Sequence, residues 1–221
     1  MESINKTIFV VKNEIFPSNT YLLKSKTNTS CLIIDPGLDT PLIDKKITEL
    51  GLQPVGIIST HGHFDHIGSV SYFKKKFNIP FYMHEADLKM SRSANFYLKV
   101  AKIDIKIETP TPDIFFKGNN DSFSLDEFQM SIHNYPGHSE GSCILKYGHY
   151  LFSGDILYKK GLGFNGFPGE NKTKLKQSIL EIFSAFSGED LILPGHGEPE
   201  YIQKIKNTNL DLINFLNLKA N

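Results

Sequence analysis

Short apolar runs and amphipathic segments alternate along the first half of the chain, with Pro, Gly and Asn between them. Apolar runs bounded by turn residues predict strands over 7–12, 21–25 and 30–35, joined as an antiparallel meander. The segment 40–51 has helical periodicity, with Thr40 placed as N-cap, Pro41 in the first turn and Gly51 at the end. A strand over 55–60, a helix over 67–77 and a strand over 81–84 are expected to follow.

The second half carries a similar pattern. A helical segment over 85–101 precedes Pro110 and Pro112, where a loop is expected. Strands are predicted over 123–135, 142–147 and 150–153, with a hairpin turn at 146–149. An amphipathic helix over 173–186, a strand over 191–193 and a final helix over 198–218 complete the pattern. Two β-rich halves that each carry helices predict an α/β fold in which two sheets pack together between helices.

Composition favours a single enzyme-sized domain over residues 1–221. Lysine plus arginine equals aspartate plus glutamate at 24 each, so the zero formal charge gives no general field for nucleic acid or an anionic membrane. Arg92 is the only arginine, so any grip on an anion would rely mainly on lysine. Cys31 and Cys143 lie in apolar runs and are expected to be buried thiols, which fits a cytoplasmic location, as does an N-terminus without a signal-peptide pattern.

The densest chemistry lies in the heptapeptide Thr60-His61-Gly62-His63-Phe64-Asp65-His66, directly after an apolar run. Imidazoles and carboxylates are ligands of zinc and related divalent ions. On an extended backbone His61 and His63 point the same way, whereas Asp65 and His66 open a new segment. This geometry favours two ions roughly 3.5 to 4 Å apart, as two-metal hydrolases use. The alternative, a group of hydrogen-bonded histidines, is disfavoured because no folding argument requires this spacing.

Three further ligand types follow glycines at the ends of predicted strands. They are His138 in Pro136-Gly137-His138, Asp155 in Ser153-Gly154-Asp155 and His196 in Pro194-Gly195-His196. A glycine allows the backbone to turn sharply and direct the next side chain out of the sheet. Each motif alone is weak, since a His or Asp after a Gly is usually a loop residue, but together with the heptapeptide they predict a common site.

Across about residues 19–196 these motifs, with Asp35-Pro36-Gly37 before them and Ser139-Glu140-Gly141-Ser142 after His138, resemble the metallo-β-lactamase superfamily. The resemblance implies a four-layer αββα sandwich of two mixed sheets. It also implies His61, His63 and His138 on one metal, Asp65, His66 and His196 on a second, and Asp155 bridging both. Asp35 would orient ligands without binding metal, although an Asp that stabilises its own turn is an equal alternative.

Asp155 is similar to the bridging aspartate of the glyoxalase II-like hydrolases, which true β-lactamases lack, so antibiotic hydrolysis is disfavoured. The sequence departs from the family pattern in two segments that are expected to determine substrate specificity. The usual Gly-Arg-Thr-Asp appears as Gly163-Phe164-Asn165-Gly166, and Glu198-Pro199-Glu200-Tyr201 replaces the usual continuation after His196. About 25 residues after His196 leave little room for the helical substrate-binding domain of full-length glyoxalase II.

The resemblance implies a dinuclear metallohydrolase that cleaves a thioester, expected to be a 2-hydroxyacyl thioester such as S-lactoylglutathione. Two ions sharing Asp155 would share a water and supply hydroxide at neutral pH, and Asp65 would help to carry the proton. Zinc is the expected metal, with iron and manganese as alternatives. Tyr158, Lys159 and Lys160 are predicted to contact the thiol carrier, and Phe164 and Phe167 to form pocket walls.

Other functions use much of the same ligand set. A persulfide dioxygenase with a single iron is the main alternative, and metal analysis with oxygen consumption separates it from a hydrolase. Lactone or phosphodiester hydrolysis is a third option, and a non-catalytic metal-binding protein is disfavoured because a closed structural site would not need open coordination positions. The sequence leaves the oligomeric state open.

Overall fold

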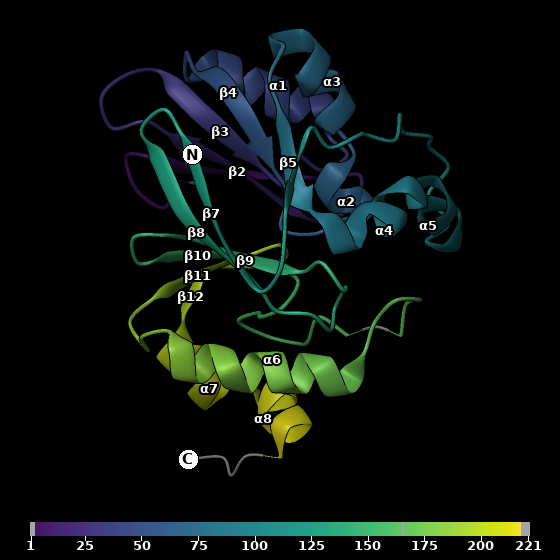
Figure 1. The fold of residues 1–221 in the computed structure, drawn as a ribbon, viewed down its shortest axis with the longest axis vertical. Coiled ribbons are helices and arrows are strands. Elements are labelled where there is room, and N and C mark those ends of the chain that lie inside the picture. The colour runs from purple at the N-terminus through teal and green to yellow at the C-terminus, as the bar shows by residue number, and fades with distance from the viewer. Residues whose placement is uncertain (1–2, 165, 218–221) are drawn as a thin grey trace.

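The architecture has two sheets packed face to face, with helices covering the outer face of each sheet (Figure 1). The structure is a computed structural model and describes residues 3–164 and 166–217. Each sheet has six strands and mixes parallel with antiparallel pairs. The predicted α/β sandwich of two mixed sheets between helices is therefore confirmed.

The first sheet begins with the predicted antiparallel meander and continues with parallel strands. Its order is β1 (Ile8–Lys12), β2 (Asn19–Lys24), β3 (Ser30–Ile34), β4 (Gln53–Ile58), β5 (Phe81–His84) and β6 (Ile114–Phe116). Its helical segments are α1 (Thr40–Glu49), α2 (Phe64–Ile67), α3 (Val70–Phe77), the 3-10 turn η1 (Glu85–Asp87), α4 (Leu88–Arg92) and α5 (Ala94–Val100).

The second sheet is antiparallel except where β10 and β11 run parallel. From edge to edge its order is β12 (Glu200–Tyr201), β11 (Leu191–Pro194), β10 (Tyr150–Gly154), β9 (Cys143–Tyr147), β8 (Phe128–Asn134) and β7 (Asn120–Leu125). Its outer face carries α6 (Lys172–Ala185), α7 (Ile202–Thr208) and α8 (Leu210–Leu216) (Figure 1). Among the described residues, no helix has both the length and the apolar character needed to cross a bilayer.

Three buried clusters form the core, because most central strands bury both faces. Side chains alternate between the two faces of a strand, so Leu22 packs in the layer under α1 and α3, whereas its neighbours Tyr21 and Leu23 pack between the sheets. A third cluster lies between the second sheet and α6 to α8. This packing explains why the strands appear in the sequence as continuous apolar runs.

One strand prediction was wrong, and one strand was missed. The segment 123–135 is a hairpin of β7 and β8, which turns at Asp126 with a positive φ of 50°. Aspartate tolerates the left-handed conformation, so this turn needs no glycine and was missed. The loop expected at Pro110 and Pro112 is present, but the short edge strand β6, which follows it and pairs with β5, was not predicted.

Three long helix predictions were too continuous. The segment 67–77 is divided at Gly68 and Ser69 into α2 and α3, and 85–101 is divided into η1, α4 and α5. The segment 198–218 contains β12, α7 and α8, and residue 218 lies outside the described residues. The Asn209 side chain accepts a hydrogen bond from the Leu212 amide and starts α8. Thr40 is the first residue of α1, and Asp39 occupies the N-cap position predicted for Thr40.

Both cysteines are buried and unpaired, as predicted. Burial raises the pKa of Cys31 to about 12, and burial raises the pKa of Cys143 as well. A raised pKa keeps each thiol protonated at pH 8, and only the thiolate reacts with disulfide reagents. We therefore expect native protein to react with Ellman's reagent at pH 8 only slowly, and protein unfolded in guanidinium to release two equivalents at once. Rapid reaction of either thiol in the native protein would contradict this placement.

Candidate metal centre

The candidate ligands meet because the strands that precede them end side by side. Strands β10 and β11 are parallel, so Asp155 and His196 leave the sheet at the same edge. Strands β3 and β4 are also parallel, with Ile34 paired to Ile58, which brings Asp35 next to the loop of His61. Gly195 passes so close to this group that a Cβ there would lie 2.1 Å from Asp155 Oδ1. The glycine before His196 is therefore required by a close approach of the backbone.

The first cluster consists of His61, His63, His138 and Asp155, all buried. His63 Nδ1 lies 3.1 Å from His61 Nε2 and 2.8 Å from His138 Nε2. Asp155 Oδ2 lies 3.5 Å from His138 Nε2. One ligand atom of each residue lies within 4.8 Å of all the others, so a single cation could contact all four side chains.

Hydrogen bonds on the far side of two imidazoles fix which nitrogen carries the proton. His138 Nδ1 donates to the Gly163 carbonyl at 2.9 Å, which leaves a lone pair on Nε2. The Thr60 hydroxyl donates to Asp35 Oδ2 at 2.7 Å and accepts from His61 Nδ1 at 3.1 Å, which leaves a lone pair on His61 Nε2. Two lone pairs thus point at His63 Nδ1, and the single proton of that nitrogen cannot satisfy both. A cation at this point fits the donor set.

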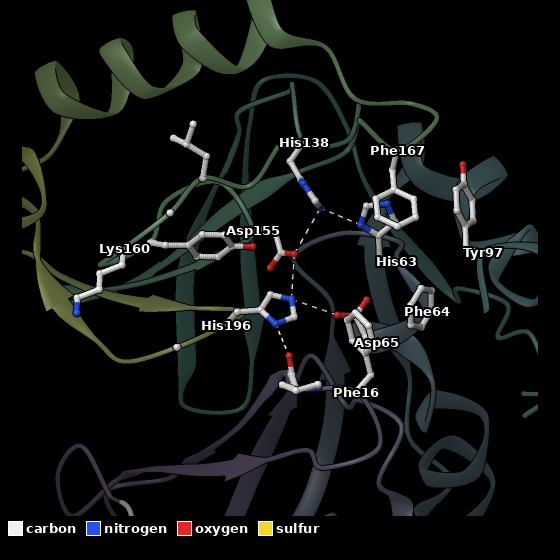
Figure 2. A pocket seen from close by; sticks show the side chains of 15 residues that line it. Phe16, His63, Phe64, Asp65, Tyr97, His138, Asp155, Lys160, Phe167 and His196 are labelled. Carbon is white, nitrogen blue, oxygen red and sulfur yellow. Dashed lines mark hydrogen bonds and ion pairs between the residues drawn. The ribbon is translucent and has the colours of Figure 1, made fainter. Parts of the chain in front are cut away.

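The second cluster consists of Asp65, His66, His196 and the same Asp155. His196 Nε2 lies 3.2 Å from Asp65 Oδ2 and 3.1 Å from Asp155 Oδ2, while its Nδ1 faces the Pro17 carbonyl (Figure 2). His66 Nε2 lies 3.3 Å from Asp65 Oδ2 and 3.4 Å from Asp155 Oδ1. Among the described residues, His66 Nε2 and Asp155 Oδ1 are buried without a hydrogen bond. Such orphaned polar atoms are costly, and a second cation fits them.

The imidazoles of the two clusters differ in protonation at neutral pH. Burial lowers the pKa of His63 to about 3 and that of His61 well below its usual range, so both imidazoles keep their lone pairs. Burial acts to raise the pKa of Asp65 and of Asp155, but the imidazoles of His66 and His196 outweigh it and hold both carboxyls ionised. In the second cluster burial acts to lower the pKa of His66 and of His196, but the carboxylates of Asp65 and Asp155 outweigh it, so the pKa of His66 lies well above its usual range and that of His196 is raised to about 10. The first cluster therefore presents neutral nitrogens, whereas a cation at the second would displace imidazolium protons.

A family comparison agrees with this arrangement. The family model described as "Metallo-beta-lactamase superfamily" matches residues 14–196, which is most of the chain. The chain belongs to the metallo-beta-lactamase superfamily. Its two His/Asp clusters and this membership together identify it as a metal-dependent hydrolase of that superfamily.

Similar proteins carry several different descriptions. A probable metallo-hydrolase, YqgX of Bacillus subtilis (strain 168), is 32% identical over 182 residues, which cover 81% of this chain and 85% of the relative. Hydroxyacylglutathione hydrolase GloC of Haemophilus influenzae (strain ATCC 51907 / DSM 11121 / KW20 / Rd) is 29% identical over 191 residues, which cover 85% and 88%.

Two solved structures share the fold closely. The crystal structure of the BLEG-1 B3 metallo-beta-lactamase has a TM-score of 0.83 and 28% identity, and the match covers 93% of this chain and 99% of that one. The crystal structure of TTHA1623 in a di-iron-bound form has a TM-score of 0.81 and 27% identity, with coverage of 91% and 98%. GloC and BLEG-1 are named for different substrates, and TTHA1623 is described with two bound iron ions.

In this superfamily member, Asp35 lies behind the ligands. Its carboxylate accepts hydrogen bonds from the Thr60 amide and hydroxyl, each at 2.7 Å, and lies 3.2 Å from His66 Nδ1. The first contact fixes the start of the His61 loop, and the second orients the His66 ring. This placement agrees with the predicted orienting role, in which Asp35 does not bind metal.

A cavity of about 510 Å³ opens onto both clusters. Tyr158 and Lys160, which are predicted to contact a thiol carrier, line this cavity, and so does Phe167, which is predicted to form a pocket wall. Two other predicted contacts are not brought to it. Lys159 turns away, with Nζ 3.6 Å from Glu200 Oε2, and Phe164 packs on the core beneath α6. The chain folds back tightly between Asp155 and Gly163, since a Cβ on Gly163 would lie 1.5 Å from the Asp155 carbonyl oxygen.

Sequence reasoning missed Asp87, which joins the two loops of the first cluster. Its carboxylate accepts hydrogen bonds from the Gly62 amide at 2.8 Å, the Ser139 hydroxyl at 2.7 Å and the Gly141 amide at 2.7 Å. The residue is only 1% exposed. The sequence signals for this contact are the two glycines, Gly62 and Gly141. A Cβ on them would lie 3.0 Å and 2.6 Å from atoms of Asp87, so no larger residue fits there. The glycines indicate a close partner but do not identify it.

We expect Asp87→Asn to weaken metal binding at the first cluster by roughly 10- to 100-fold, because the amide cannot accept all three hydrogen bonds that align the loops. Competition with a chromophoric chelator measures the affinity of each site. Asp190→Asn is a matched control, since Asp190 is also buried and accepts the Ser187 amide at 3.0 Å, but at the opposite end of β11 from His196. A lower melting temperature with unchanged metal affinity in Asp87→Asn would mean that Asp87 supports only the fold.

Proposed function

We propose that the protein is a dinuclear metallohydrolase that cleaves thioesters of the 2-hydroxyacyl-glutathione type. The observation that carries the proposal is that Asp155 belongs to both clusters and lies on the wall of the cavity. Water adds to the thioester carbon and the carbon–sulfur bond breaks, which yields a carboxylate, a thiol and a proton. The similarity to the hydrolase GloC supports the thioester class.

Each of the two clusters would hold one ion. His61, His63 and His138 would hold one ion and Asp65, His66 and His196 the other, with Asp155 contacting both. Two such ions, when bound, lower the pKa of water and polarise a carbonyl. The carboxylates of Asp65 and Asp155 face the cavity, where Asp65 would help to carry the proton that leaves the attacking water.

The walls of the cavity would hold the thiol carrier. Tyr158 lies against the candidate metal centre, with its ring centroid 5.9 Å from that of His196. Burial, and to a lesser extent the nearby Asp155 carboxylate, raises the pKa of the Tyr158 hydroxyl well above its usual range. The Tyr158 hydroxyl therefore stays protonated and donates to Asp155, and its side chain would contact the carrier from the cavity wall. Lys160 is the lysine that lines this cavity, and its ammonium would attract a carboxylate of a carrier such as glutathione.

Zinc is the proposed metal, and iron is its main alternative because TTHA1623, at 27% identity, is described in a di-iron-bound form. A single iron with oxygen consumption would instead support a persulfide dioxygenase. Elemental analysis of protein purified without added metal separates zinc, iron and manganese, and also gives the number of ions per chain.

β-Lactam hydrolysis is the second candidate, favoured by the likeness to the BLEG-1 B3 metallo-beta-lactamase. The shared Asp155 argues for thioesters instead, because it resembles the bridging aspartate of the glyoxalase II-like hydrolases. One assay panel separates these functions: S-lactoylglutathione, a glutathione persulfide, a lactone, a phosphodiester and a chromogenic cephalosporin. The proposal requires the thioester to give the highest kcat/KM.

Replacing the shared ligand tests the centre directly. We expect Asp155→Ala to lower metal content below two ions per chain and to reduce thioester turnover by more than about 100-fold, since both ions lose a ligand and the carbonyl loses its polarising partner. Metal analysis and kinetics on the same preparation are the measurement. Full activity in the variant, or a fully metal-loaded native protein inactive on every compound of the panel, would refute the dinuclear hydrolase.

A further inference from the structure

The cavity has two chemically different sides (Figure 2). Phe64, Tyr97 and Phe167 gather on the side of His63, whereas Lys160 lies beyond His196 and Asp155 on the other side. The candidate metal ligands lie between them. A substrate whose reacting carbonyl lies at the ligands must therefore place one end against aromatic rings and the other toward an ammonium group.

The aromatic side is held in place by polar contacts of its backbone and of Tyr97. The Tyr97 hydroxyl donates to the Pro168 carbonyl at 3.0 Å, which ties α5 to the segment that carries Phe167. Glu170 accepts the Phe167 amide at 3.0 Å and fixes the same segment from its other end. The Tyr97 ring lies 5.8 Å from the His63 ring, so this surface adjoins the first cluster.

The polar groups on the aromatic side of the cavity already have partners. The Tyr97 hydroxyl is occupied by Pro168, and the polar side chains that line the cavity beside the three rings, His63 and Asp65, belong to the two clusters. Phe16, with its ring centroid 5.2 Å from that of Phe64, extends the apolar surface toward His196. An acyl hydroxyl group would gain no partner on this surface, whereas an apolar chain would be removed from water.

We propose that this surface is an acyl-binding subsite, here called the aromatic subsite (Phe64, Tyr97 and Phe167), which selects thioesters with an apolar acyl chain. The carrier then lies toward Lys160. The inference rests on the proposed thioester function and revises only its acyl group, from a 2-hydroxyacyl group to an apolar chain, because the three rings line the part of the cavity next to the first cluster. The acyl group enters the aromatic side, and the thiol leaves on the side of Lys160.

Chain-length dependence tests the subsite. Burying one methylene group is worth about 0.8 kcal/mol, so kcat/KM should rise about fourfold for each methylene added between S-acetyl and S-hexanoylglutathione. S-Lactoylglutathione should be a poorer substrate than S-butyrylglutathione. The zinc-reconstituted full chain is the enzyme for these assays.

Variants then place the effect on the aromatic subsite. Phe167→Ala should reduce the gain to less than about twofold per methylene, whereas Phe167→Leu should retain most of it. Phe96→Ala is the matched control, because Phe96 is the neighbour of Tyr97 on α5 but is 59% exposed and does not line the cavity. Metal content is measured for each variant, so that a loss of the centre is not mistaken for a loss of the subsite.

The direction of binding has its own test. Lys160→Gln should raise KM for glutathione thioesters, which carry carboxylates, and leave KM unchanged for the uncharged N-acetylcysteamine thioesters of the same acyl groups. The chain-length dependence should be the same in both series, because the acyl end does not contact Lys160.

The outcomes separate this inference from the proposed function. Thioesters that are hydrolysed with no dependence on chain length, or a dependence that persists in Phe167→Ala, overturn the aromatic subsite while the hydrolase stands. A metal-loaded enzyme that cleaves no thioester in either series overturns the proposed function, and the aromatic subsite with it.

Discussion

The structure depends on the crowding of electron-donating atoms around Asp155. Imidazole lone pairs from His61 and His138 point at His63, and the carboxylates of Asp65 and Asp155 lie among the imidazoles of His66 and His196. Without positive charge this arrangement is unfavourable, because buried lone pairs repel one another and buried anions lose their hydration. The protein tolerates it because the surrounding hydrogen bonds leave the donors no other orientation.

Topology supplies that rigidity. Each parallel pair, β3 with β4 and β10 with β11, delivers two polar side chains to the same edge, and the core clusters on both faces of the sheets prevent the strands from shifting. Asp35 and Asp87 then connect loops that come from different strands. The centre is thus held by elements of both sheets, so its geometry requires the complete sandwich.

The sequence predicted what is locally encoded. The heptapeptide carries four candidate ligands at a spacing that no ordinary loop needs, and glycines marked His138, Asp155 and His196, so all seven residues that the structure brings together were identified. Features set by distant contacts could not be found this way. Asp87 contacts residues that are 25 to 54 positions away, and no motif surrounds it.

The errors have the same origin. Lys159 and Phe164 lie in the expected segment, but their directions are decided by Glu200 and by the core beneath α6. The turn between β7 and β8 uses aspartate where a glycine would have revealed it, and β6 exists only because β5 offers an unpaired edge. In each case a tertiary partner decided between conformations that local pattern leaves equally open.

The tight return of the chain at Gly163 has an evolutionary consequence. Gly163 packs against the Asp155 carbonyl, and its own carbonyl accepts a hydrogen bond from His138 Nδ1. The segment between Asp155 and Gly163 is therefore fixed to the candidate metal centre at both ends. Tyr158 and Lys160 lie within this segment. New selectivity can therefore arise by exchanging side chains inside it, whereas insertions or deletions there would disturb cation affinity. Diversification within such a lineage should keep the segment's length while its composition drifts.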